Sequence, residues 1–485
     1  MTATGEIPIN RFTLFTTYFG YLVLITFGML RDLLAKVTGK SRYAQELNPK
    51  NNALFSGWER FYTRRLFNRI QDCWARPLVG RPSVWIELAP REFTETQRLK
   101  TEWEGVPRRV LNLGSYNYLG FADEDWNKTC GQQVRDAFHQ FGISCTSGPV
   151  SSNCVTKDQE LLAQEVASFV GKDDAIIFNT GYITNAWTIS KLVGPGSLII
   201  SDSLNHTSIV NGCRSSGAKT VTFVHNDPDD LEKVIISNAF AISPESEIPK
   251  KILVVVEGLY SMEGQVCNLK AILQVVKKYK CFLYVDEAHS IGALGKTGRG
   301  ICELAGVNPS QVDILMGTFT KSFGGLGGYI ASSKAVCDLL RVHMGQDPTC
   351  RTAMSPIVCA QVRRSLYLLR ETEIGKQKLR QLKENSLFFR IELKKMGCSV
   401  LGDDDSPIVP LMLYHPAKIA AFSRECLLRG LAVVVVGSPA VPLIGSRARF
   451  CLSASHTRAD LVFALREIRK VAKMLNLRYE KSAFG

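Results

Sequence analysis

Short apolar runs alternate with helical patterns from about residue 110 onward. The runs that predict strands lie at residues 175–178, 197–201, 220–224, 252–257, 282–286, 314–317 and 329–331. Segments between them, such as 158–170, 268–280 and 334–344, carry apolar residues at three- and four-residue spacing, which predicts helices. Because the runs are apolar without alternation, they are typical of strands buried on both faces. The sequence therefore predicts a large α/β domain around a parallel or mixed sheet.

The pattern changes after residues 355–356. A long charged helix is expected over 357–396, and it is followed by short strands near residue 399 and at 408–414, 431–436 and 449–453. A final helix is expected from Arg458. These elements predict a second, smaller α/β domain. The expected organisation is an N-terminal hydrophobic segment at 1–41, a basic and aromatic arm at 42–110, a large domain at 111–355 and a small domain at 356–485.

Residues 12–30 contain no charged side chain. A helix of that length spans about 28 Å, close to the hydrocarbon core of a bilayer. The segment that follows is richer in Lys and Arg than the segment that precedes it, so the positive-inside rule places the rest of the chain in the cytosol. We expect a membrane-associated helix, which either spans the membrane or lies in its interface; a buried helix is the alternative.

The arm at 42–110 combines Arg with Trp, Phe and Tyr. This composition suits an interfacial belt or a partner-binding arm, and equally an amphipathic helix packed on the main body.

Composition narrows the class of protein. Hydrophobic residues make up 45% and charged residues 21%, which excludes a mostly disordered chain. The net charge is +14, and a basic surface of this kind can meet nucleic acid, an anionic membrane or an acidic ligand such as coenzyme A. None of the 14 cysteines forms a C-x-x-C pair, so we expect neither a disulfide scaffold nor a metal site.

Two motifs combine strand ends with reactive side chains. In FLYVDEAHSIGALGKT, an apolar run ends at Asp286, and His289 follows three residues later. Ligands of open α/β sheets lie at the carboxyl ends of strands, so both side chains are placed to face one. In ILMGTFTKSFGGLGG, Lys321 follows a buried strand and lies among glycines. A lysine in such a desolvated pocket can react with a carbonyl group.

The strings DEAH and GALGKT also suggest a nucleic-acid ATPase, but the phosphate-binding loop G-x-x-x-x-G-K-[ST] is incomplete. Ser290 stands where the first glycine of that loop is required, and the motif does not occur elsewhere in the chain. We therefore expect no nucleic-acid partner.

Two further segments complete the pattern of a pyridoxal 5'-phosphate (PLP) site. This cofactor needs a lysine for its aldehyde and an acid opposite its ring nitrogen. It also needs phosphate donors, and FNTGY at 178–182 leaves a strand and enters a helical pattern whose backbone N–H groups would point at a phosphate. His206 in SDSLNHTSI can lie flat on the ring.

These motifs, together with VEGLYSMEG and LNLGSYNYLGF, resemble the α-oxoamine synthases, which are PLP-dependent transferases of fold type I. Within that family, TFTKSFGG and the hydrophobic N-terminus are most similar to the LCB2-type catalytic subunits of eukaryotic serine palmitoyltransferase. The resemblance covers residues 110 to 485. It implies a decarboxylative condensation of L-serine with a long-chain acyl-CoA such as palmitoyl-CoA. It also implies a heterodimer with an LCB1-type subunit at the endoplasmic reticulum membrane, with the catalytic domain facing the cytosol.

The resemblance assigns a role to each matching residue. Lys321 would bind the cofactor aldehyde and later move the Cα proton, Asp286 would pair with the ring nitrogen, and His289 would reach the phenolic oxygen. The remaining residues would bind the cofactor or the substrate: His206 on the ring face and at the substrate carboxylate, Gly181, Tyr182 and Thr320 at the phosphate, Thr318 near the ring, and Arg449, in RARFCLSASHT, at the amino-acid carboxylate.

One segment departs from the family. The usual S-T-R-H-E type run has no counterpart in residues 142–157, which contain neither Arg nor His. The alternatives are another α-oxoamine synthase, which makes 5-aminolevulinate or 2-amino-3-ketobutyrate, and a non-catalytic scaffold subunit of the same fold. The uncharged residues 12–30 disfavour the first alternative, and the retained Lys321 disfavours the second.

Overall fold

The computed structural model describes residues 9–38, 57–93, 99–101, 105–123, 125–144, 156–240, 249–347, 350 and 352–479. Its centre is a seven-stranded sheet in the order β6-β12-β11-β10-β9-β7-β8. All neighbours are parallel except β12, which is antiparallel to both β6 and β11. The strands are β6 (Asp174–Phe178), β7 (Leu198–Asp202), β8 (Lys219–Phe223), β9 (Ile252–Glu257), β10 (Phe282–Asp286), β11 (Ile314–Thr318) and β12 (Gly328–Ser332).

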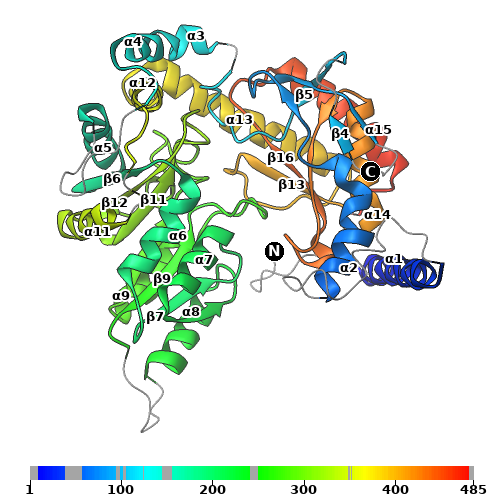
Figure 1. Ribbon diagram of the computed structural model, residues 1–485, viewed down its shortest axis with the longest axis horizontal. Coiled ribbons are helices and arrows are strands. Elements are labelled where there is room, and N and C mark those ends of the chain that lie inside the picture. Colours follow the sequence, from blue (N-terminus) through cyan, green and yellow to red (C-terminus); the bar gives the residue numbers. More distant parts are fainter. Residues whose placement is uncertain are drawn as a thin grey trace.

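Helices cover both faces of this sheet, because its strands alternate apolar side chains between two cores (Figure 1). Tyr284 of β10 points to the core that holds Trp187, whereas Leu283 and Val285 point to the core that holds Leu162. The first core is covered by α6 (Gly181–Leu192), α7 (Thr207–Ser216) and α11 (Lys334–Gln346), and the second by α5 (Lys157–Val170), α8 (Pro228–Ile235), α9 (Leu269–Lys278) and α10 (Ile301–Ala305).

The helix expected over 357–396 is two helices, so that prediction was wrong. Helix α12 (Pro356–Glu371) ends before Thr372, which has an extended backbone (φ −127°, ψ 157°), and α13 (Glu373–Lys395) begins directly after it. Gly375 lies so close to the backbone of Leu369 that an added Cβ would clash with it. The chain therefore bends at this point although the helical pattern continues.

Two small sheets form the second unit. One has the order β13-β16-β15, and the other has the order β1-β2-β5-β14. Residues 431–436, predicted as one strand, contribute to both sheets. The strand expected near residue 399 is reduced to two isolated bridges, Cys398 with Arg478 and Val400 with Leu411. The elements are β13 (Ile408–Met412), β14 (Leu431–Ala432), β15 (Val434–Val436), β16 (Arg447–Cys451), β1 (Leu78–Val79), β2 (Trp85–Leu88), β5 (Arg108–Asn112), α14 (Pro416–Leu428) and α15 (Arg458–Met474).

The predicted basic arm therefore packs with the C-terminal part of the chain. Strand β5 pairs in parallel with β14, and Leu111 and Cys73 share a core with Phe450. Figure 1 shows these N-terminal elements beside α14, α15 and β16. The predicted domain boundaries themselves stay a prediction.

Smaller elements are α2 (Gly57–Arg65), η2 (Phe67–Cys73), β3 (Arg91–Phe93), β4 (Leu99–Thr101), α3 (Trp126–Thr129), α4 (Gly131–Phe141), η3 (Ile236–Phe240), η4 (Pro309–Gln311) and η5 (Leu443–Gly445).

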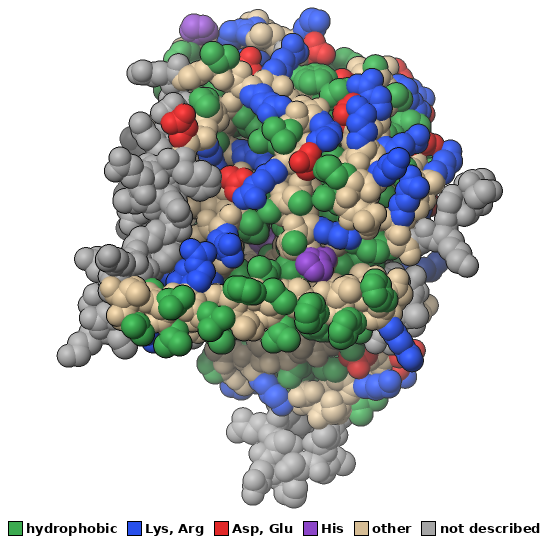
Figure 2. Space-filling view, turned by 90° about the vertical axis from the view of Figure 1, so that its right-hand side faces the viewer, with side chains coloured by type: hydrophobic (Ala, Val, Ile, Leu, Met, Phe, Trp, Pro, Cys, Tyr) green, Lys and Arg blue, Asp and Glu red, His purple; other side chains and the backbone are tan. Residues whose placement is uncertain are grey.

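Helix α1 (Arg11–Thr38) lies along the surface of the small unit, where it contacts α14, η5 and α2. Its inner side is small or polar, and Asp32 forms ion pairs with Arg64, at 2.6 Å, and with Arg65. Its outer side is a row of exposed apolar side chains, shown in Figure 2, which includes Phe12, Phe15, Phe19, Leu22, Phe27, Leu30, Leu33 and Leu34. Length and composition alone would allow α1, which contains an 18-residue stretch with a mean hydropathy of 1.6, to cross a membrane.

Candidate active site

A cavity of about 320 Å³ opens where the carboxyl ends of β9, β10 and β11 meet the start of α6 and strand β16. It brings together every site residue expected from the sequence, while the role of each stays a prediction. The expected residues that line it are Gly181, Tyr182, His206, Asp286, His289, Thr318, Thr320, Lys321 and Arg449.

Lys321 follows β11 by three residues and lies half-buried in this cavity. Its Nζ is 5.6 Å from the centroid of the Tyr116 ring. Burial lowers the pKa of Lys321 to about 8, although the negative charge of Asp286 opposes this effect. At pH 7 about a tenth of an amine with this pKa is unprotonated, and this is the form that can act as a nucleophile or base.

Asp286 ends β10 and is held by two donors. One carboxylate oxygen accepts from Asn185 Nδ2 at 2.7 Å, and the other accepts from the backbone N–H of Ala288 at 2.8 Å. The side chain is buried, with 4% of the residue exposed. Since Asn185 is itself held by the hydroxyl of Tyr284 at 2.8 Å, the direction of this carboxylate is fixed.

His206 enters the cavity from the start of α7. Its Nδ1 caps this helix by accepting the backbone N–H of Ser208 at 3.2 Å, so a neutral ring carries its proton on Nε2. Its own backbone N–H donates to Glu257 Oε1 at 2.5 Å. Burial lowers the pKa of His206, and the positive charge of Lys321 acts in the same direction. The imidazole is therefore neutral at physiological pH.

His289 is buried in the cavity lining, where its Nδ1 lies 2.7 Å from the hydroxyl of Tyr118. Burial lowers the pKa of His289 well below its usual value, and Lys321 and Arg449 add to this effect. The ring is therefore neutral, and its orientation is fixed by the contact with Tyr118.

The first turn of α6 forms another wall. Gly181 is its first residue, and a Cβ at this position would approach Thr318 Oγ1 to 2.8 Å. Thr318 Oγ1 is in turn 2.8 Å from Thr320 Oγ1. The backbone N–H groups at the start of α6 lack partners within the helix, so this wall suits an anionic group such as a phosphate.

Arg449 of β16 closes the cavity from the small unit. Its guanidinium group lies 4.9 Å from the centroid of the Tyr116 ring and donates to the hydroxyl of that residue. Among the described residues its buried Nε has no hydrogen-bond partner. This side chain therefore retains a donor for a ligand.

Sequence reasoning missed nine further residues that line the cavity, and these include Tyr116, Asn185, Ser208 and Glu257. Glu257 carried a usable signal, because it ends β9 as Asp286 ends β10, and the two residues are partners in the register of these parallel strands. Asn185 lies about one helical turn after Gly181, a spacing that becomes informative only once α6 is placed against β10. Residues 145–155, where the expected Arg-containing run is missing, lie outside the described part of the chain.

Comparisons with known proteins define the class. The aminotransferase class I and II family matches residues 108–468, and the chain belongs to this family. Long chain base biosynthesis protein 2d of Oryza sativa subsp. japonica is 48% identical over 96% of this chain and 95% of its own length. Serine palmitoyltransferase 2 of Dictyostelium discoideum is 45% identical over 96% of this chain and 95% of its own length.

Solved structures agree with this placement. A serine palmitoyltransferase (SPT) structure with PLP has a TM-score of 0.73 and 29% identity, and the match covers 88% of this chain and 100% of that chain. The predicted α/β fold of the PLP-dependent transferases and the resemblance to the LCB2-type group of the α-oxoamine synthases are thereby confirmed.

Proposed function

We propose that this chain is the catalytic subunit of a serine palmitoyltransferase. It would condense L-serine with a long-chain acyl-CoA, such as palmitoyl-CoA, to give 3-ketosphinganine, carbon dioxide and free coenzyme A. The observation that carries this proposal is the pairing of Lys321, whose pKa is lowered to about 8, with the buried carboxylate of Asp286 in one cavity.

The residues that line the cavity fit PLP. Lys321 would bind the aldehyde, and Asp286 would keep the ring nitrogen protonated. The start of α6, with Thr320, would hold the phosphate, because the Cβ that Gly181 lacks leaves room next to Thr318. When bound, PLP withdraws electrons from the substrate Cα and so makes its proton acidic.

The chain's own side chains would then orient the substrate and move its proton. Arg449 would bind the serine carboxylate through its unpartnered Nε, since a guanidinium group matches a carboxylate in shape and charge. The Lys321 amine would take the Cα proton. The neutral His206 would lie on the face of the cofactor ring, with its Nε2–H available to the substrate.

Spectroscopy and an assay with one matched control test this function. We expect purified protein to carry a visible absorption band that is lost in Lys321→Ala, and to release coenzyme A from palmitoyl-CoA only when serine is present. Lys334→Ala, an exposed lysine of α11, should keep both properties. Failure of the wild-type protein to bind PLP would contradict every enzymatic function considered. A greater release of coenzyme A with glycine than with serine would contradict serine as the substrate.

We also propose that the chain pairs with an LCB1-type subunit and attaches through α1 to the cytosolic face of the endoplasmic reticulum membrane. Support comes from the outer side of α1, where Leu22 and Phe27 are 59% and 61% exposed. Because the body covers the inner side of α1, a helix lying in the membrane interface fits better than a free span.

Membrane fractionation tests this attachment. Deletion of residues 1–41, or Leu22→Glu combined with Phe27→Glu, should move the protein from carbonate-washed membranes to the soluble fraction. Val106→Glu, at an exposed position outside α1, should leave the protein in the membrane fraction. If the deleted protein stays in the pellet, attachment through α1 alone is wrong.

A further inference from the structure

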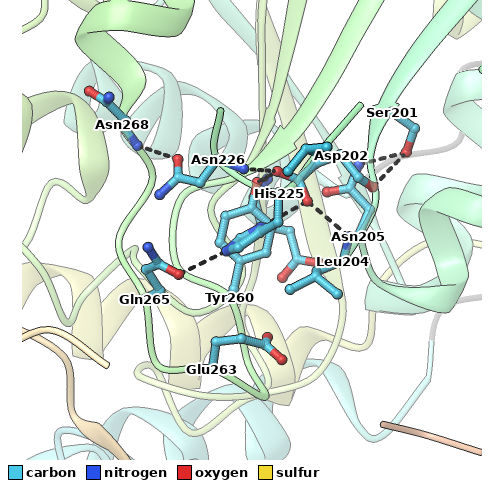
Figure 3. Close-up of polar contacts among 12 residues, drawn as sticks. Ser201, Asp202, Leu204, Asn205, His225, Asn226, Tyr260, Glu263, Gln265 and Asn268 are labelled. Atoms are coloured by element: carbon cyan, nitrogen blue, oxygen red, sulfur yellow. Dashed lines mark hydrogen bonds and ion pairs between the residues drawn. The ribbon is translucent and has the colours of Figure 1, made fainter. Parts of the chain in front are cut away.

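A buried carboxylate lies at the end of β7 and is not part of the cavity lining. Asp202 accepts four hydrogen bonds, two on each oxygen, so the capacity of the group is filled (Figure 3). Oδ1 accepts from the backbone N–H of Leu204 and from His225 Nδ1, both at 2.9 Å. Oδ2 accepts from the backbone N–H of Asn226 at 2.9 Å and from the hydroxyl of Tyr260 at 3.0 Å. One side chain thus joins the loops that follow β7, β8 and β9.

His225 is the charged partner of Asp202. Its side chain is 5% exposed, and its Nε2 lies 3.0 Å from Gln265 Oε1, so an acceptor faces each ring nitrogen. The Tyr260 ring packs edge-on against the imidazole, at 4.3 Å between centroids. An acceptor on each ring nitrogen, one of them a buried carboxylate, favours the imidazolium form of His225.

Asp202 and its neighbours fix the loop that carries His206. Asn205 Nδ2 donates to Ser201 Oγ and to the backbone carbonyl of Val255, each at 2.8 Å. The backbone N–H of His206 donates to Glu257, and the backbone N–H of Glu257 donates to the hydroxyl of Tyr260 at 3.3 Å. A continuous chain of contacts therefore runs from His225 through Asp202 and Tyr260 to the two cavity residues Glu257 and His206.

We propose that His225 is a positioning residue for the reaction: its contact with Asp202 fixes the loop at 203–206 and so holds the His206 imidazole in the cavity. This inference rests on the proposed function. His225 touches neither substrate nor cofactor. It acts through His206, whose position determines the contacts of its imidazole with the cofactor ring and with the serine carboxylate.

Three variants and one control separate positioning from general loss of stability. His225→Asn keeps a donor near the Nδ1 position, whereas His225→Leu removes it and leaves Asp202 uncompensated. His206→Ala removes the group through which His225 acts. Leu231→Ala is the control, because Leu231 is fully buried on α8 but takes no part in the polar contacts. All proteins are full-length and are compared at temperatures below their unfolding transitions.

Three measurements apply to each protein: kcat and KM for serine, the dissociation constant of PLP, and the carbethoxylation rate of His206 in the cofactor-free protein, followed by peptide mass spectrometry. We expect His225→Leu to lower kcat at least about tenfold, because small displacements of a catalytic group have effects of this size. It should also weaken PLP binding and speed carbethoxylation of His206. His225→Asn should largely restore all three values, and Leu231→Ala should keep them despite a lower unfolding temperature.

The double variant gives the sharpest result. If His225 acts through His206, then His225→Leu has little further effect on kcat or PLP binding in the His206→Ala background. Additive effects, no rescue by His225→Asn, or an unchanged carbethoxylation rate would each overturn the inference. A wild-type protein that binds no PLP would contradict the proposed function instead, and the carbethoxylation rates would still report on the loop.

Discussion

Glu257 and Asp286 lie side by side at the ends of two parallel strands, where two negative charges would repel each other. Burial raises the pKa of Glu257 well above its usual value, and the charge of Asp286 adds to this effect. These effects favour the neutral form of Glu257, whose carboxyl group accepts the backbone N–H of His206.

This state predicts that Glu257→Gln, which has the shape of the neutral acid, keeps kcat within about threefold of wild type and keeps the unfolding temperature. Glu257→Ala should destabilise the fold by about 1–3 kcal/mol, because it leaves the backbone N–H of His206 without its acceptor. Steady-state kinetics and thermal unfolding check both variants. Equal losses in the two would show that Glu257 works as an anion.

His225 predicts a pH dependence of stability. Burial alone would lower its pKa, but the hydrogen bond to Asp202 and the charge of that group outweigh burial and raise the pKa; Glu263 also favours the charged form. Tyr260 and Gln265 are the other groups that face the ring. A histidine whose pKa is raised on folding stabilises the fold fully below its unfolded pKa of about 6.5, and this contribution is lost as pH rises through the folded pKa.

The loss of this contribution should therefore lower the unfolding temperature of the wild-type protein as the pH rises above about 6.5. His225→Asn should not show this decrease, because an amide does not titrate. Thermal unfolding of both proteins across this range provides the measurement. Parallel curves for the two would contradict the assignment of a charged His225.

At the level of single residues, the sequence predicted those side chains that sit in short motifs at strand ends. Asp286 ends one apolar run and Lys321 lies three residues after another, so their meeting in one cavity follows from the parallel order of β10 and β11. Tyr116 and Asn185 could not be found in this way, because their place in the cavity depends on how distant elements pack. The Asp202–His225 pair was missed for the same reason, since β7 and β8 become neighbours only in the folded sheet.

At the level of elements, strands were predicted well and breaks within a pattern were not. The apolar runs marked all seven strands of the large sheet to within one residue at each end. The break at Thr372 left no signal in the helical periodicity, and the close approach of Gly375 to Leu369 that accompanies it is visible only in the folded chain. Similarly, the run at 431–436 shows no sign that Leu431 and Val434 belong to different sheets.

Gly375 gives a test of this close approach. A methyl group at this position would overlap the backbone of Leu369, so Gly375→Ala should lower stability by about 1–3 kcal/mol, despite the higher helix propensity of alanine. Lys376→Ala, at the exposed neighbouring position, should leave the stability unchanged or raise it slightly. Urea unfolding measures both variants, and a stabilised Gly375→Ala protein would show that α12 and α13 can separate at no cost.

At the level of the whole molecule, the small unit is built from both ends of the chain. The backbone N–H of Leu111 donates to Gly430 at 2.8 Å, that of Leu113 donates to Ala432 at 3.0 Å, and that of Cys451 donates to Leu113 at 2.9 Å. Strand β5 is therefore joined to β14 and to β16, and β16 carries Arg449. Leu111 and Leu113 are fully buried in the same core.

This arrangement predicts that the N-terminal region divides into a removable part and an essential part. A chain that begins at residue 57 loses α1 but keeps the small sheet, so we expect it to be folded, with PLP binding close to that of the full chain. A chain that begins at residue 114 loses β5 and exposes the core around Leu431, so it should aggregate even though its large sheet is complete. Soluble yield and thermal unfolding measure both truncations. A folded, PLP-binding protein from residue 114 would mean that the large and small units fold independently of the arm.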